Sequence, residues 1–65
     1  MKAKTVEQFI ILKFLEENLE IQLFEIDLLD RKNVLVTDRE GAQMIFTYED
    51  RKITYRDLEE WLNGK

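Results

Sequence analysis

The chain of 65 residues contains no cysteine, histidine, serine or proline, and it has only two glycines. Without cysteine the fold has no disulfide, and without cysteine and histidine it lacks the usual ligands of structural zinc. Side-chain packing or association must therefore hold so small a domain together. The absence of proline is typical of a chain made almost wholly of regular helices and strands.

The same absences narrow the chemistry that the chain can perform. The common nucleophiles and the side chain that carries protons near neutral pH are missing, and two glycines are too few for a phosphate-binding glycine loop. Glu25 and Asp27 share one face of an expected strand, but a hard cation takes six or more oxygen ligands. We predict no enzyme activity, small-molecule substrate, cofactor or metal site.

The composition predicts one compact domain over residues 1–65. Apolar residues make up 45% of the chain and charged residues 37%, with a formal net charge of −4, which is typical of a globular protein. A weakly acidic balance disfavours nonspecific binding to nucleic acid. The apolar runs are too short to span a membrane, and no signal-peptide cleavage site follows the first run. These features predict a cytoplasmic protein without membrane contact.

The first regular element is a helix with an unusually wide apolar surface. Thr5 followed by Gln8 is typical of a capping box, which predicts that the helix begins there, and Asn18 is suited to end it. Six large apolar side chains fill an arc of roughly 200° on the helical wheel. These side chains are Ile10, Ile11, Leu12, Phe14, Leu15 and Leu19. Such an arc is about twice the width that one packed helix face needs.

Three strands are expected after this helix. Residues 19–29 show no consistent helical face, whereas read as a strand they alternate in polarity; a helix remains the alternative there. Two further β-rich segments, 34–37 and 42–48, follow turn sequences at 30–33 and 38–41. The pattern predicts a three-stranded antiparallel meander.

A second helix is expected over residues 55–63. Thr54 with Asp57 resembles another capping box, and Leu58, Trp61 and Leu62 supply one apolar face. Gly64 stands where a left-handed residue often ends a helix. The fold class is therefore α+β, in the order αβββα, with the meander flanked by an N-terminal and a C-terminal helix.

A three-stranded sheet cannot cover so wide a helical arc, so apolar surface should be left over. If both helices pack on one face of the sheet, the other face presents Leu23, Leu35 and Ile45 as a patch. If they take opposite faces, that patch is covered and the first helix, including Ile11, is partly exposed. Both arrangements predict a small protein-interaction or regulatory module that binds a protein or a second copy of itself as a homodimer.

Nucleic-acid binding is the alternative function. Arg31 and Lys32 lie in the first expected turn, and Arg51 and Lys52 in the third, so a meander places all four at the same end of the sheet. They would form a small basic corner, and Tyr48 or Tyr55 could stack on a base. Neighbouring acidic residues neutralise much of that charge, which ranks this function second.

Overall fold

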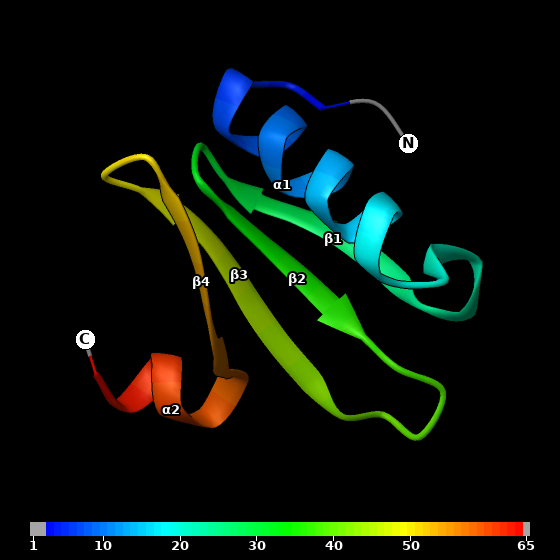
Figure 1. Cartoon of the computed structure of the whole chain (residues 1–65). Coiled ribbons are helices and arrows are strands. Elements are labelled where there is room, and N and C mark those ends of the chain that lie inside the picture. The colour runs from blue at the N-terminus through cyan, green and yellow to red at the C-terminus, as the bar shows by residue number, and fades with distance from the viewer. Residues whose placement is uncertain (1–2, 65) are drawn as a thin grey trace.

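The computed structural model describes residues 3–64 and shows a four-stranded antiparallel sheet with two helices. The strands follow each other in the order β1-β2-β3-β4, so the sheet is a simple meander (Figure 1). The α+β class is confirmed, but the sheet has one strand more than the sequence predicted. The elements are α1 (Val6–Asn18), the 3-10 helix η1 (Ile21–Leu23), β1 (Glu25–Asp30), β2 (Asn33–Thr37), β3 (Gln43–Glu49), β4 (Lys52–Asp57) and α2 (Leu58–Asn63).

The fourth strand occupies residues that were expected to form a turn and the start of the last helix. Asp50 and Arg51 both have positive φ angles, 55° and 64°, as in the two-residue turns that reverse a β-hairpin most tightly. The chain therefore returns at once along β3, and Ile53 and Tyr55 pair with residues of that strand. β-Branched and aromatic residues favour this pairing.

Helix α2 is consequently shorter than predicted. It begins at Leu58 with Asp57 as its N-cap residue, whose side chain makes no capping hydrogen bond. The predicted capping box from Thr54 to Asp57 is wrong because Thr54 lies inside β4. Gly64 has a φ of −83° and does not adopt the predicted left-handed conformation.

Helix α1 begins as predicted, because the Thr5 hydroxyl accepts a hydrogen bond from the Gln8 N–H at 3.0 Å. The reciprocal bond is shifted by one residue, since Gln8 Oε1 accepts from the Lys4 N–H at 2.8 Å. Asn18 is still helical and donates to the Phe14 carbonyl. The extended residue Leu19 ends the helix, so the predicted left-handed Asn18 is wrong.

Residues 19–29 are neither one strand nor one helix. The 3-10 turn at Ile21–Leu23 comes first, and β1 begins only at Glu25. The Phe24 N–H donates to the Ile21 carbonyl at 3.1 Å and closes this turn. The turn carries the chain from the end of α1 into the plane of the sheet.

The faces of the sheet are as the alternation of polarity predicted. Ile26, Val36 and Met44 stand beside one another on adjacent strands, as do Leu28, Val34 and Phe46. Helix α1 packs on β2 and β3 over this side, which we call the α1 face. The buried core consists of Ile11, Leu15, Val34, Val36 and Phe46.

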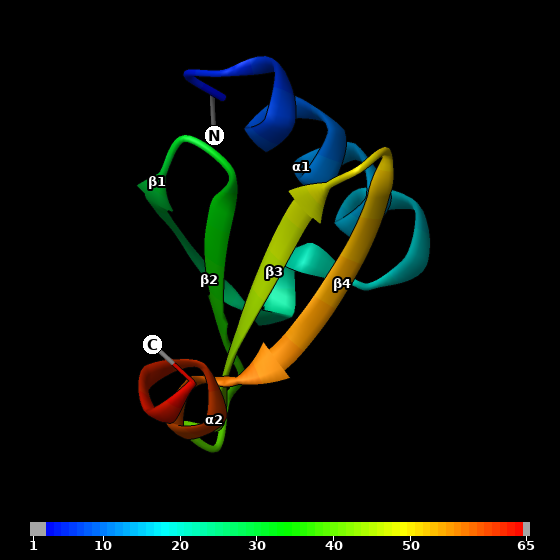
Figure 2. The same ribbon diagram turned by 90° about the vertical axis from the view of Figure 1, so that its left-hand side faces the viewer.

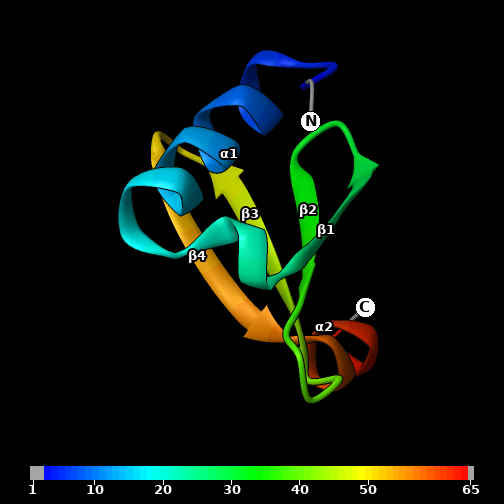
Figure 3. The ribbon, with the colours of Figure 1, turned by 90° about the vertical axis from the view of Figure 1, so that its right-hand side faces the viewer.

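The two helices lie on opposite faces of the twisted sheet (Figures 2 and 3). Helix α2 contacts β3 and β4 near one end of the sheet, on the side that we call the α2 face. Ile45 points to the α2 face, because its neighbours Met44 and Phe46 point to the other, and it is fully buried. The arrangement with both helices on one face is therefore wrong.

Candidate protein-interaction surface

Helix α1 exposes a large aromatic side chain on each side of its buried stripe. Ile11 and Leu15 face the sheet and are fully buried. Phe9 and Phe14 project from opposite flanks of the helix, with 59% and 37% of their surfaces exposed. The sheet covers the centre of the arc only, since α1 packs on β2 and β3 and a helix covers a width of about two strands.

An apolar groove of about 430 Å³ lies between the C-terminal half of α1 and strand β4. Its floor is Phe46, whose ring centroid lies 6.3 Å from that of Phe14 and 5.5 Å from that of Tyr55. Tyr55 is 63% exposed although it points to the α1 face. We call this surface the aromatic groove and define it by Phe14, Leu19, Phe24, Met44, Phe46 and Tyr55.

The end of the aromatic groove is formed by an ordered loop between β2 and β3. Asp38 lines the groove, and its carboxylate Oδ1 accepts the backbone N–H groups of Glu40 and Ala42 at 2.8 and 3.0 Å. Gly41 has a φ of +90°, a conformation that side chains disfavour. Asp38 therefore holds the loop in shape and places one carboxylate at an otherwise apolar rim.

The structure does not bring the predicted contact residues together on one surface. Ile11 and Ile45 are fully buried, Ile11 beneath α1 and Ile45 on the α2 face. Leu35 is half-buried beside Ile45, and Leu23 lies apart from both in η1 with 45% exposure. The predicted patch is not open because α2 lies on that face of the sheet.

Sequence reasoning did not bring Phe14 and Tyr55 together on one protein-interaction surface. Phe14 was placed in the apolar arc, and the wheel alone does not show which flank the sheet leaves uncovered. Tyr55 was placed at the start of a helix, so its alternation with Ile53 was overlooked. Reading residues 52–57 as a strand would have placed Tyr55 on the α1 face.

A second, more open hollow lies at the other end of α1. Val6, Phe9 and Leu29 of β1 line it, with exposures of 71%, 59% and 41%. This hollow is open and has a mixed polar and apolar lining. It lacks the aromatic floor of the groove beside β4.

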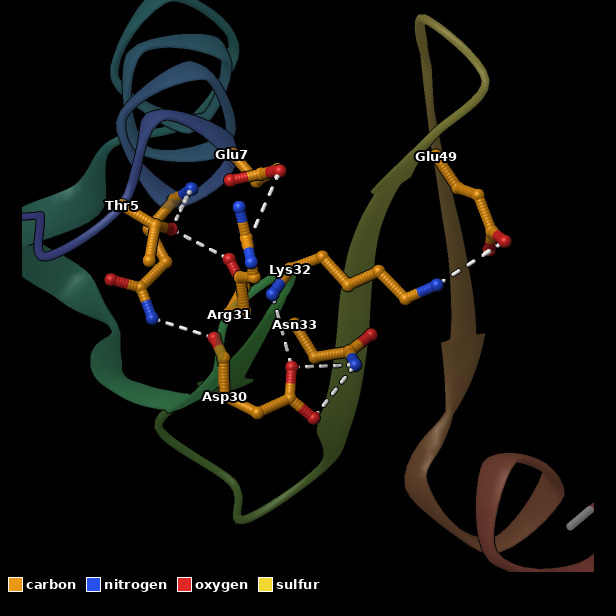
Figure 4. A network of polar contacts seen from close by, with 8 residues as sticks. Thr5, Glu7, Asp30, Arg31, Lys32, Asn33 and Glu49 are labelled. Carbon is orange, nitrogen blue, oxygen red and sulfur yellow. Dashed lines mark hydrogen bonds and ion pairs between the residues drawn. The ribbon is translucent and has the colours of Figure 1, made fainter.

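The basic residues of the alternative function do lie at one end of the sheet, in the turns that follow β1 and β3. Two of them face carboxylates: Lys32 Nζ lies 3.2 Å from Glu49 Oε2, and Arg31 Nε lies 3.7 Å from Glu7 Oε2 (Figure 4). Lys52 directly follows the other turn, beside Arg51. Pairing with carboxylates weakens the attraction of this corner for phosphate.

A polar network fastens α1 to the same end of the sheet. Gln8 is 3% exposed, and its Nε2 donates to the Asp30 carbonyl at 2.6 Å. Asn33 Nδ2 donates to both carboxylate oxygens of Asp30, at 2.8 and 3.0 Å (Figure 4). The Thr47 hydroxyl donates to Asn33 Oδ1. These bonds satisfy the buried polar side chains, so the network has a structural role.

Taken together, the fold and its surface define a small α+β domain with one open aromatic groove. Across residues 3–64 there is no cluster of three or more acidic side chains that could hold a metal ion. No helix in the same range is long and apolar enough to cross a membrane. Comparison with protein-family models, curated protein sequences and solved structures found no match to this chain.

Proposed function

We propose that this chain is a non-enzymatic protein-interaction module that binds through the aromatic groove. One observation carries the proposal: Phe14 and Tyr55, on two different elements, flank Phe46 and remain exposed beside it. Aromatic side chains in a desolvated pocket are the residues that most often dominate the energy of protein interfaces.

The surroundings of the groove support a protein partner. Its lining is almost wholly apolar, and Asn18 and Asp38 supply polar groups at the rim. An apolar centre with a polar rim is the usual anatomy of a protein interface. The centre would supply affinity, and the rim carboxylate would favour a partner that presents a cation or a hydrogen-bond donor there.

The test compares two leucines of nearly equal exposure. Leu19 lies in the groove and is 37% exposed, whereas Leu29 on β1 is 41% exposed and lies outside it. A photoreactive amino acid is introduced at either position in cells that produce the chain. Crosslinked peptides are then identified by mass spectrometry.

We expect adducts to a defined protein segment from position 19 and none from position 29. The segment can belong to another protein or to a second copy of this chain, since the groove would be the binding site in both cases. Equal labelling from the two positions, or no adduct from position 19, would contradict the proposal. Leu19→Asp should also abolish the association, while Leu29→Asp should preserve it.

A further inference from the structure

The two edges of the sheet differ in how they are protected against pairing with another strand. The register of β1 shifts between Leu28 and Asp30. This shift breaks the regular series of backbone groups along the outer side of β1. An irregular register is a common means of blocking an edge strand.

Strand β4 shows no such protection within the described part of the chain. All six of its residues pair with β3 in an unbroken register, from Lys52 opposite Glu49 to Asp57 opposite Met44. It is the last strand in the sheet order, so no strand of residues 3–64 covers its outer side. Lys52, Arg56 and Asp57 carry charge on this strand, but its backbone groups form a regular series, and a regular edge is a template for another strand.

The backbone groups that β4 presents at this edge can be identified. The Tyr48 N–H donates to the Lys32 carbonyl at 3.1 Å and therefore points toward β2. Tyr48 and its partner Ile53 thus form a non-hydrogen-bonded pair, and such pairs alternate along an antiparallel ladder. By this alternation Ile53, Tyr55 and Asp57 direct their backbone groups outward.

We infer that the β4 strands of two copies of this chain pair with each other in antiparallel orientation. The two-fold axis passes beside Tyr55, and the pairing joins the two sheets into one. This inference rests on the proposed function and names the partner. Tyr55 would exchange two backbone hydrogen bonds with its own copy. The pair of Ile53 with the second copy's Asp57 occurs twice and would add up to about four more. An interface in which one strand serves both partners needs no second binding surface.

Charge favours this register over its neighbours. An axis at Thr54 would place Lys52 opposite the second copy's Arg56, and an axis at Arg56 would place that residue opposite itself. Like charges directly opposite on adjacent strands are destabilising. With the axis at Tyr55, Arg56 faces the neutral Thr54, and two aromatic rings meet at the centre.

The helices do not obstruct this pairing. A two-fold axis normal to the sheet keeps both α1 helices on one face, about four strand spacings or roughly 19 Å apart. Helices with a diameter of about 10 Å fit at that separation. Helix α2 begins three residues beyond the axis, so the two α2 helices lie toward opposite ends of the joined sheet. Each aromatic groove gains the second copy's Tyr55 beside its own.

The first test uses the fact that only a residue on the axis meets itself. We expect sedimentation experiments up to millimolar concentration to show a wild-type dimer. Tyr55→Lys and Tyr55→Glu should each be monomeric, because each places two like charges together. An equimolar mixture of the two variants should recover the dimer. The exposed position of Tyr55 favours folding of both variants.

A second variant tests the register without changing Tyr55. Thr54→Glu brings a carboxylate opposite the second copy's Arg56 twice in the proposed dimer, which should tighten it by about two-fold to thirty-fold. In a dimer centred on Thr54 the same change would instead oppose two carboxylates and weaken it. A weaker dimer for Thr54→Glu would overturn the proposed register.

Amide hydrogen exchange supplies a measurement that needs no substitution. Exchange at Ile53 and Tyr55 should slow as protein concentration rises. Exchange at Thr54 should not change, because its N–H already points to β3. A wild-type chain that stays monomeric at millimolar concentration, or a dimer without slowed exchange at Tyr55, would overturn the β4 pairing. Adducts from position 19 to another protein would still support the proposed function in that case.

Discussion

Replacing Gln8 by glutamate should make the stability of the domain depend on pH in a specific direction. Gln8 donates from Nε2 to the Asp30 carbonyl and accepts from the Lys4 N–H through Oε1. An ionised carboxylate can still accept from Lys4, but it cannot donate to Asp30. A protonated carboxyl group can do both. Gln8→Glu therefore changes the donor without changing the size of the side chain.

The expected loss at neutral pH is large for so small a domain. Gln8 is 3% exposed, and losing a buried hydrogen-bond partner costs ~1–3 kcal/mol, with more for a buried charge. Domains of this length have a total stability of ~3–10 kcal/mol. A loss of ~2 kcal/mol corresponds to a decrease in Tm of roughly 8–16 °C.

The sign of the pH dependence follows from the bond to Asp30. Burial and donation to a carbonyl both favour the protonated form, so the pKa of the introduced carboxyl should rise above its ordinary value of about 4.3. Relative to wild type, the variant should be most stable below about pH 4.3 and lose stability as the pH rises through the raised pKa.

Thermal unfolding followed by circular dichroism between acidic and neutral pH measures this difference. Gln22→Glu is the matched control, because Gln22 is exposed and its amide reaches only the exposed Glu20 carboxylate, at 3.4 Å, so its pH-dependent difference from wild type should be small. A difference for Gln8→Glu that does not change with pH would refute the role assigned to the bond between Gln8 and Asp30.

Two further substitutions test the turn after β3 and the α2 face. Arg51→Gly should raise Tm by a few degrees, because Arg51 has a φ of 64° that costs a non-glycine residue about 1–2 kcal/mol. Lys52→Gly in the adjacent strand should lower Tm. Equal changes in Tm for the two variants would contradict the positive-φ turn. Ile45→Asp should unfold the domain, since Ile45 is fully buried. Leu35→Asp should preserve the dispersed amide spectrum of a folded protein. A folded Ile45→Asp variant would show that the α2 face is open.

Several elements could be predicted because their signals are local. The Thr5 hydroxyl accepts a hydrogen bond from the N–H of Gln8, three residues further along the chain. Four consecutive residues were therefore enough to predict where α1 begins. The alternation of Val34, Val36, Met44 and Phe46 indicated which side chains share a face, since the period of a strand is a property of its own backbone.

The fourth strand could not be predicted in the same way. Residues 52–57 carry helix-compatible signals such as Thr54 and Asp57, and their strand conformation depends on pairing with β3 across a turn at Asp50 and Arg51. Such pairing is a tertiary contact, and tertiary contacts override weak local propensity. Recognition of a two-residue turn would have been needed to find it.

By itself, the sequence determined that α1 carries more apolar surface than one sheet covers, because that excess is a matter of composition and helical period. Only the tertiary structure decided where the excess lies. The path of the chain placed α2 on the face opposite α1, which buried Ile45 and left Phe14 and Tyr55 exposed beside Phe46. The choice of face depends on contacts between segments far apart in the chain, which the periodicity of one segment does not specify.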